Sequence, residues 1–301
     1  MILPASPAAF ARARAVLERG GLVALPTETV YGLAADARDP AAVASIFALK
    51  GRPATNPLIT HLPEPGWAEA FGEMNAHAQA LAGRFWPGPL TLVVDRLPEA
   101  GFTDMVSAGL PTVALRCPDA PWRAHIPLPL AMPSANRSGH VSPTTAEHVA
   151  EEFGDGLLVI DGGPCRGGLE STVVRVSKGG AAVLRPGTVT EEEIARLAPP
   201  IEVEGVGSPG LRLKHYAPAK PLRLEAVEAR EAEHLIGFGG VEGASTLSKT
   251  GDLQEAARNL YAALRAADAD ASATAIAVAP VPERGVGRAI GDRLRRAARG
   301  R

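Results

Sequence analysis

Residues 22–33 have the sequence LVALPTETVYGL, in which four apolar residues lead directly into a group of hydroxyl and carboxyl side chains. A short apolar run that ends at a proline indicates a buried strand. Ligands of open α/β sheets bind beyond the ends of strands, so Thr27, Glu28 and Thr29 are candidates for a ligand site. The alternative is an ordinary turn in which the threonine side chains bond their own backbone.

Helical and strand patterns alternate on both sides of this stretch. Ser6, Asp39, Ser142 and Thr190 each precede a helical pattern as capping residues, and Glu193 completes a capping box with Thr190. The predicted helices cover 7–19, 40–50, 75–86, 144–153 and 191–198. The predicted strands cover 22–25, 89–94, 112–116, 130–132, 157–161 and 171–176. Because this order lacks strict βαβ regularity, we expect a mixed α/β sheet rather than a doubly wound one.

The pattern changes after about residue 199, where proline and glycine become dense and no helical or strand period is visible. We interpret 201–221 as a linker between a first domain at 1–200 and a small second domain at 222–301. In the second domain LRLE is followed by a helical stretch, by HLIGFGG, and by helix, strand and helix patterns. This alternation predicts a small α/β domain with parallel strands.

The composition limits the class of protein. A net charge of −2 argues against a protein that coats nucleic acid. Cys117 and Cys165 form no C-x-x-C pair, so we predict neither a disulfide framework nor a zinc site. The N-terminal residues lack a basic segment followed by an apolar run, and no apolar run approaches the roughly 18 residues of a membrane span. We therefore expect a cytoplasmic protein.

Two cations flank a glycine at the end of the helix predicted over 40–50. Lys50 supplies a compact charge and Arg52 a bidentate fork, a pair suited to clamping a triphosphate. Helix termination by itself also selects lysine in the last turn and Gly51 after it. Lys50 therefore has a structural alternative that Arg52 lacks. The nearby His61 has the alternative of an ordinary structural histidine.

The segment PSANRSG at 133–139 follows an apolar run. In an extended segment Ser134 and Asn136 point to the same face, so both could reach one ligand. The alternative is an ordinary loop, since serine, asparagine and glycine are common loop residues. The basic C-terminal segment DRLRRAARGR, at 292–301, is interpreted as the solvated face of an amphipathic helix.

Together and in this order, the motifs resemble the YrdC-like threonylcarbamoyl-AMP synthase family in its longer, two-domain form. The blocks that carry the resemblance are PTETVYGL, KGRP with NPLI and His61, FWPGPLTLV, PTVALR, PSANRSG, STVV, LRPG, SPGLRLKHYAP and GRAIGDRLRRAA. They span nearly the whole chain. The resemblance implies a concave, positively lined cavity on a twisted mixed sheet, together with a small Rossmann-like C-terminal domain.

The resemblance also implies roles for individual residues. A set that would hold the nucleotide phosphates consists of Lys50, Arg52, Ser134 and Asn136. The rest of the implied ATP site consists of Asn56, Thr112, Ser142, Arg185 and Tyr216. The implied threonine site consists of Thr29, His61, Arg116, Met132 and Ser171. The HYAP part of the linker would fold over the mouth of the cavity.

The implied reaction joins L-threonine, bicarbonate or CO2, and ATP, and releases pyrophosphate. Its product, threonylcarbamoyl-AMP, would serve threonylcarbamoyladenosine modification of tRNA through a downstream tRNA threonylcarbamoyl-transferase complex. We expect a nucleotidyltransferase that uses Mg²⁺, with no metal ligand assigned among the side chains, and leave direct tRNA binding open. The alternative is an RNA-binding or ribosome-associated factor, against which the net charge of −2 and the 4% aromatic content count.

Overall fold

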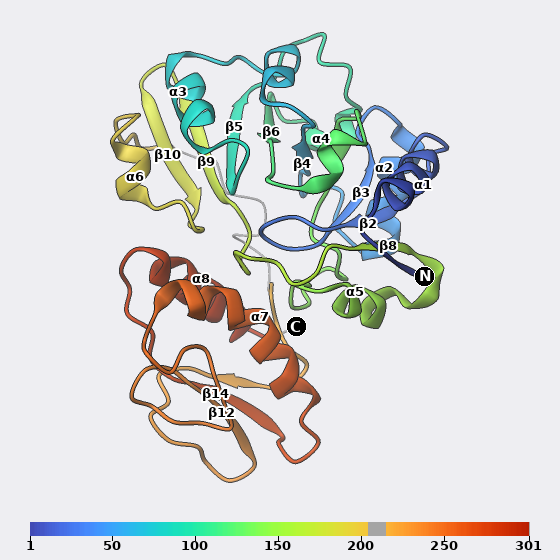
Figure 1. Cartoon of the computed structure of the whole chain (residues 1–301). Coiled ribbons are helices and arrows are strands. Elements are labelled where there is room, and N and C mark those ends of the chain that lie inside the picture. The colour runs from blue at the N-terminus through green and yellow to red at the C-terminus, as the bar shows by residue number, and fades with distance from the viewer. Residues whose placement is uncertain (204–214, 301) are drawn as a thin grey trace.

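The computed structural model of the chain describes residues 1–203 and 215–300. These residues form a large and a small β-sheet, each with its own helices, and the two lie at opposite ends of the molecule (Figure 1). None of the helices in these ranges combines the length and hydropathy that a membrane crossing requires. The expected linker at 201–221 lies partly outside the described residues, as does most of the block SPGLRLKHYAP.

The large sheet has ten strands in the order β1-β8-β2-β3-β7-β4-β6-β5-β9-β10. Its strands are β1 (Ile2–Pro4), β2 (Val23–Leu25), β3 (Gly32–Asp36), β4 (Ile59–His61), β5 (Leu90–Asp95), β6 (Thr112–Arg116), β7 (Leu130–Ala131), β8 (Leu158–Asp161), β9 (Thr172–Ser177) and β10 (Gly180–Arg185). Strands β4 and β6 pair in parallel, whereas β5 and β6 pair antiparallel. This mixture confirms the predicted mixed sheet.

Helices cover the large sheet where the capping residues predict them. The α-helices are α1 (Pro7–Leu17), α2 (Pro40–Lys50), α3 (Ala76–Phe85), α4 (Asp104–Ser107), α5 (Ala146–Phe153) and α6 (Glu191–Ala195), with 3₁₀ turns at Pro65–Ala70, Pro121–Ala124 and Gly154–Gly156. Ser6 and Asp39 cap α1 and α2 through side-chain oxygens, and Thr190 forms its capping box with Glu193. Local sequence therefore determines where these helices begin.

The beginning of α5 corrects one prediction. Ser142 does not cap this helix, because the cap is Thr145, whose side chain accepts a hydrogen bond from the His148 amide. The Ser142 hydroxyl instead donates to the Glu170 carboxylate over 2.6 Å. A charged acceptor in a buried setting forms a stronger hydrogen bond than a helix amide donor, so the tertiary contact takes this side chain.

The small sheet has four strands in the order β11-β14-β12-β13, all parallel as predicted. Its elements are β11 (Leu222–Arg223), β12 (Glu233–Gly237), β13 (Ser245–Thr246), α7 (Leu253–Ala269), β14 (Ala275–Val278) and α8 (Val286–Ala297). The helical stretch expected between β11 and β12 is wrong, since those residues form turns and irregular backbone. In Figure 1, α7 and α8 lie on the side of this sheet that faces the large domain.

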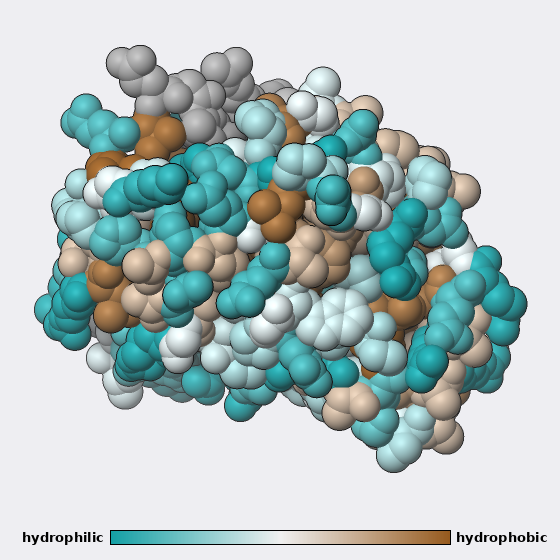
Figure 2. Space-filling model, turned by 90° about the horizontal axis from the view of Figure 1, so that it is seen from above, coloured by the Kyte–Doolittle hydropathy of each residue, from teal (hydrophilic) through white to brown (hydrophobic). Residues whose placement is uncertain are grey.

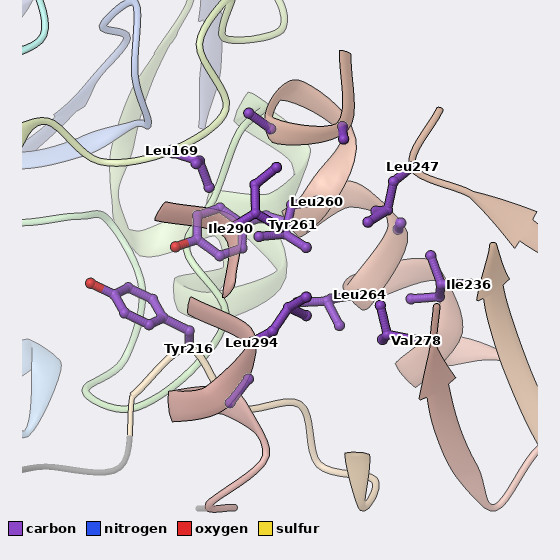
Figure 3. Packing of buried hydrophobic residues seen from close by; sticks show 14 of the residues in the cluster. Leu169, Tyr216, Ile236, Leu247, Leu260, Tyr261, Leu264, Val278, Ile290 and Leu294 are labelled. Atoms are coloured by element: carbon purple, nitrogen blue, oxygen red, sulfur yellow. The ribbon is translucent and has the colours of Figure 1, made fainter. Parts of the chain in front are cut away.

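A single apolar cluster joins the two domains. Val30, Val141 and Leu169 from the large domain pack with Tyr216 and with the buried faces of α7 and α8. Figure 3 shows Leu169 and Tyr216 at one edge of this cluster, beside Tyr261 of α7. Because a continuous apolar core excludes water from the boundary, the small domain is held against the large one by burial as well as by polar contacts.

The two backbones approach closely at Gly168, in the glycine-rich loop that follows β8. This residue has φ +72°, and a Cβ atom there would lie 2.4 Å from the Cα of Arg258 on α7. The Arg258 guanidinium donates to the carbonyl of Arg166 over 3.1 Å. The loop is therefore part of the domain interface, and glycine is required there because no side chain fits.

The basic C-terminal helix also corrects a prediction. Arg293 is completely buried and Arg296 is almost so, although the helix was expected to present a solvated basic face. Its other arginines reach carboxylates at the surface; Arg288 pairs with Glu192 over 2.7 Å. On the face shown in Figure 2, hydrophilic residues predominate and hydrophobic ones form small separate patches.

Candidate active site

A cavity of about 820 Å³, part of it open to solvent, is lined by residues of β3, β4, β5, β6, β9 and β10 and by the segments 27–30, 52–57, 132–134, 170–171 and 215–216. Ten of the residues that the resemblance implies line it: Thr29, Arg52, Asn56, His61, Arg116, Met132, Ser134, Ser171, Arg185 and Tyr216. Four do not line it, namely Lys50, Thr112, Asn136 and Ser142. The tertiary structure thus gathers residues separated by more than a hundred positions around one cavity.

Arg116 forms one charged end of the cavity. Its guanidinium lies 2.7 Å from the Glu28 carboxylate and donates to the Thr29 hydroxyl over 2.9 Å. It also donates to the carbonyl of Gly88 over 3.2 Å. These partners fix the plane of the guanidinium, and its second terminal nitrogen has only a long contact of 3.5 Å to His61. That nitrogen is suited to bind a ligand carboxylate.

The two histidines that line the cavity are neutral. Burial, and then the nearby positive charge of Arg116, lower the pKa of His61 well below its usual value. Burial likewise lowers the pKa of His215 to about 3. Both side chains therefore contribute polar atoms without charge near neutral pH, and the positive charge of the cavity comes from its arginines.

Arg52 and Arg185 form the second charged end. Arg52 donates to the carbonyls of Asn56 and Pro57 over 3.1 and 2.8 Å, while Arg185 donates to the carbonyl of Ser171 over 3.0 Å. Burial lowers the pKa of Arg52 to about 10, so it remains protonated at neutral pH. Arg185 is buried and Arg52 partly so, and their hydrogen bonds to described residues go to neutral oxygens. Two cations in this setting are suited to an anionic ligand such as a polyphosphate.

Lys50 supports the cavity wall and does not face the cavity. Its ammonium group donates to the carbonyl of Ser134 over 2.5 Å and to the carbonyl of Asn136. Burial lowers its pKa well below the usual value, and the charge of Arg52 adds to the effect. Lys50 therefore ties the end of α2 to the PSANRSG loop. Its expected contact with phosphates stays a prediction.

The remaining predicted ligands lie behind or away from the wall. The Asn136 side-chain amide donates to the carbonyls of Arg137 and His140 over 2.8 and 2.9 Å, which closes the loop on itself. Its side-chain oxygen is buried without a hydrogen-bond partner. Thr112 begins β6 opposite Asp95, two residues before the cavity-lining Ala114. The roles implied for Asn136, Thr112 and Ser142 stay predictions.

Tyr216 covers the cavity from the side of the C-terminal domain. Its backbone lies in the left-handed region with φ 64°, which is uncommon for an aromatic residue and is frequent at functional positions. The next residue pairs with the PSANRSG loop, since the amide of Ala217 donates to the carbonyl of Gly139 over 2.8 Å. His215 and Tyr216 of HYAP therefore line the cavity, whereas 208–214 of that block are outside the described residues.

Two carboxylates bear on this site: Glu28, which the sequence analysis named as a ligand candidate without a role, and Glu170, which it missed. Glu28 holds Arg116, and its place in PTETVYGL at a strand end was a usable signal. Glu170 lines the cavity and receives hydrogen bonds from Ser142, Tyr261 and Arg293. Its partners lie far along the chain, so no local pattern indicated it.

The described residues do not form a metal site by themselves. Within 1–203 and 215–300, no group of three or more His, Cys, Asp or Glu side chains is placed to hold a metal ion. The carboxylates nearest the cavity, Glu28 and Glu170, are already paired with Arg116 and Arg293. These residues therefore do not fit a resident Mg²⁺ ion held by protein side chains.

Comparison with known proteins covers almost the whole chain. A family model described as telomere recombination matches residues 15–187, and one described as the C-terminal domain of threonylcarbamoyl-AMP synthase matches residues 189–299. Threonylcarbamoyl-AMP synthases of Bacillus subtilis and Pyrococcus abyssi are each 38% identical, covering 97% and 94% of this chain and 93% and 92% of the relatives. The crystal structure of P. abyssi Sua5 complexed with L-threonine aligns with a TM-score of 0.89 at 35% identity, over 99% of this chain and 97% of that one.

Proposed function

The chain belongs to the threonylcarbamoyl-AMP synthase family, and from that premise we propose that its cavity joins L-threonine, bicarbonate or CO2, and ATP. The products are threonylcarbamoyl-AMP and pyrophosphate. The observation that carries the proposal is that a single cavity is lined by Arg116, which lies beside His61, and by Arg52, which lies close enough to Arg185 for that charge to lower its pKa. Such a cavity offers separate cationic sites for an amino-acid carboxylate and for a polyphosphate.

The reaction balances without a protein nucleophile. The threonine amine bonds to the carbon of CO2 and loses a proton, which gives a carbamate; from bicarbonate, water also leaves. A carbamate oxygen then bonds to the α-phosphorus of ATP, and the bond between that phosphorus and the oxygen bridging to the β-phosphate breaks. Pyrophosphate leaves with that bridging oxygen. The protein's part is to align the reactants and to stabilise charge on the phosphates.

Arg52 and Arg185 would bind the phosphates, because both line the cavity and arginine keeps its charge at neutral pH. Both are held by backbone carbonyls, so little reorganisation is needed when an anion binds. Ser134 and Asn56 also line the cavity, and among the described residues the buried side-chain oxygen of Asn56 has no hydrogen-bond partner. That oxygen is suited to accept a hydrogen bond from the nucleotide.

Arg116 would bind the threonine carboxylate, with Glu28 and Thr29 fixing its guanidinium. Neutral His61 and the apolar side chain of Met132 border this end and keep it poor in water. A carbamate decomposes in water, so a dry and closed site favours its transfer. Tyr216 would close the cavity from above.

Several finer points form part of the same proposal. By its chemistry the enzyme is a nucleotidyltransferase, and Mg²⁺ enters as part of the substrate, bound to the ATP phosphates. The protein works in the cytoplasm and delivers its product to a downstream complex that modifies tRNA. The domain limits 1–200, 201–221 and 222–301 also stay part of this proposal.

The test is pyrophosphate release by the pure protein with Mg²⁺, ATP, bicarbonate and one amino acid at a time. We expect release that requires both L-threonine and bicarbonate, with a product that carries threonine, carbonate carbon and AMP. Pyrophosphate release that ignores threonine would contradict the proposal. Salt-sensitive RNA binding without ATP consumption would favour the RNA-binding alternative instead.

A further inference from the structure

Glu170 connects the cavity wall to the C-terminal domain. One of its carboxylate oxygens accepts from the Ser142 hydroxyl over 2.6 Å. The other accepts from the Tyr261 hydroxyl of α7 over 2.8 Å and from the Arg293 guanidinium of α8 over 2.9 Å. All four side chains are buried. Figure 3 shows the Tyr261 hydroxyl directed away from the apolar side chains of the small domain.

The same guanidinium also contacts the residue that covers the cavity. The central carbon of Arg293 lies 5.2 Å from the centre of the Tyr216 ring, within the range of a cation–π contact. The ring of Tyr216 stacks on that of Tyr261 with centroids 5.8 Å apart. Arg293 and Tyr261 thus hold both an acidic residue and an aromatic residue of the cavity wall.

Glu170 needs such a partner because of its neighbours. Within the described ranges, Glu170 is the single acidic residue among those that line the cavity. Arg185 lies close enough for its charge to favour the ionised form of Glu170. Although burial opposes its charge, Arg293, Arg185 and the hydrogen bond from Ser142 together lower the pKa of Glu170 to about 2. A buried carboxylate without compensation draws the nearest available cation to itself.

Resting on the function proposed above, we propose that Arg293 and Tyr261 are positioning residues that hold the Glu170 carboxylate away from Arg185. The charge of Arg185 then remains available to the nucleotide phosphates, and Tyr216 stays over the cavity. The C-terminal domain would in this way control nucleotide binding without contributing a phosphate ligand of its own. Threonine binding at Arg116 would depend much less on Arg293 and Tyr261.

The experiment compares four full-length proteins: wild type, Arg293→Met, Glu170→Gln and the double variant. We expect Arg293→Met to raise the KM for ATP by at least about tenfold and the KM for threonine by less than about threefold. Glu170→Gln should raise the KM for ATP by clearly less than Arg293→Met does, because it removes a negative charge and no positive one. The double variant should regain most of the ATP affinity lost in Arg293→Met.

Two results would overturn the proposal. One is an equal rise of both KM values in Arg293→Met, which would indicate general damage to the fold. The other is a double variant that binds ATP no better than Arg293→Met. Thermal unfolding checks that each protein folds. If the double variant does not fold, the Glu170→Gln protein alone decides. A loss of ATP affinity in Glu170→Gln as large as that in Arg293→Met would then contradict the proposal.

Failure of the proposed function would be visible separately. Wild-type protein that releases no threonine-dependent pyrophosphate would reject that function and leave the positioning proposal open to test. In that case calorimetric titration of the same four proteins with a nonhydrolysable ATP analogue gives the affinities directly. Tyr261→Phe, which removes a hydrogen bond and no charge, should weaken binding of the analogue less than Arg293→Met does; an equal loss would count against the role of charge.

Discussion

The two domains differ in how they use buried polar side chains. In the large domain, buried polar groups gather around the cavity, among them Thr29, His61 and Arg116. In the described part of the small domain, the buried charged side chains are Arg293 and Arg296, on the helix that faces the large domain. Since burying polar groups is costly unless they are paired, their location indicates where function resides.

The comparison teaches that the small domain is a support rather than a second reaction centre. Its core is apolar, and Arg293 reaches across the domain boundary to Glu170. A domain of this kind stabilises the cavity by packing and by charge compensation. The predictions below test this division of roles, beginning with the largest expected effect.

Arg52→Ala should lower threonine-dependent pyrophosphate formation by about 100-fold or more, since one fixed charge that stabilises developing phosphate charge is lost. The measurement is initial rate at saturating substrates. Arg38→Ala is the matched control, because Arg38 is half exposed and pairs with Asp36 at the surface. Activity within tenfold of wild type in Arg52→Ala would show that the phosphates bind elsewhere.

Gly168→Ala should push the loop that contains residue 168 away from α7. We expect it to lower the free energy of unfolding by about 3 kcal/mol, because backbone strain and overpacking add together. Gly163→Ala is the control, since this residue also has positive φ, +77°, yet a Cβ there would meet no atom within 4 Å. Gly163→Ala should lower the free energy of unfolding through backbone strain alone, by about 1 kcal/mol. Urea unfolding measures the stability of both variants. If both lose the same free energy of unfolding, the contact with α7 does not contribute to the effect of Gly168→Ala.

Lys50→Met should lower the free energy of unfolding by about 2 kcal/mol, because the carbonyls of Ser134 and Asn136 lose a buried donor. The sequence left a phosphate clamp and helix termination as alternatives for Lys50, and the two carbonyl contacts give it a structural role. Arg52→Ala, measured in the same urea titration, should be the more stable of the two variants. A Lys50→Met protein as stable as wild type would favour the phosphate role.

Acidification should destabilise the fold around the cavity through two histidines, His61 and His215, whose pKa values burial lowers. Because burial lowers the pKa of His61 and His215 in the folded state, the unfolded chain binds more protons below its histidine pKa of about 6.5. Stability is therefore full above that pH and falls as pH decreases, by up to about 1.4 kcal/mol per pH unit for each histidine. Urea midpoints between pH 8 and pH 5 measure this slope. His61→Gln should reduce the slope, and an unchanged slope would contradict a neutral His61.

Much of the fold was predictable because its signals are local. The caps at Ser6, Asp39 and Thr190 act within three residues, and strand periodicity within five or six. Parallel pairing in the small domain followed from the alternation of strands and helices. Short strands such as β1 and β13 carry too few residues for a period to be visible. Most residues named from the resemblance line the cavity, although their roles await the experiments above.

The sequence by itself determined where the helices capped by Ser6, Asp39 and Thr190 begin, and it contains the set of motifs that indicates the family. Only the tertiary structure decided which partner each charged group meets. Ser142 leaves its expected cap for Glu170, Lys50 turns to two loop carbonyls, and Arg293 enters the core to meet a carboxylate 123 residues away. Capping and periodicity depend on neighbours along the chain. Desolvation and charge pairing depend on neighbours in space, which local sequence does not contain.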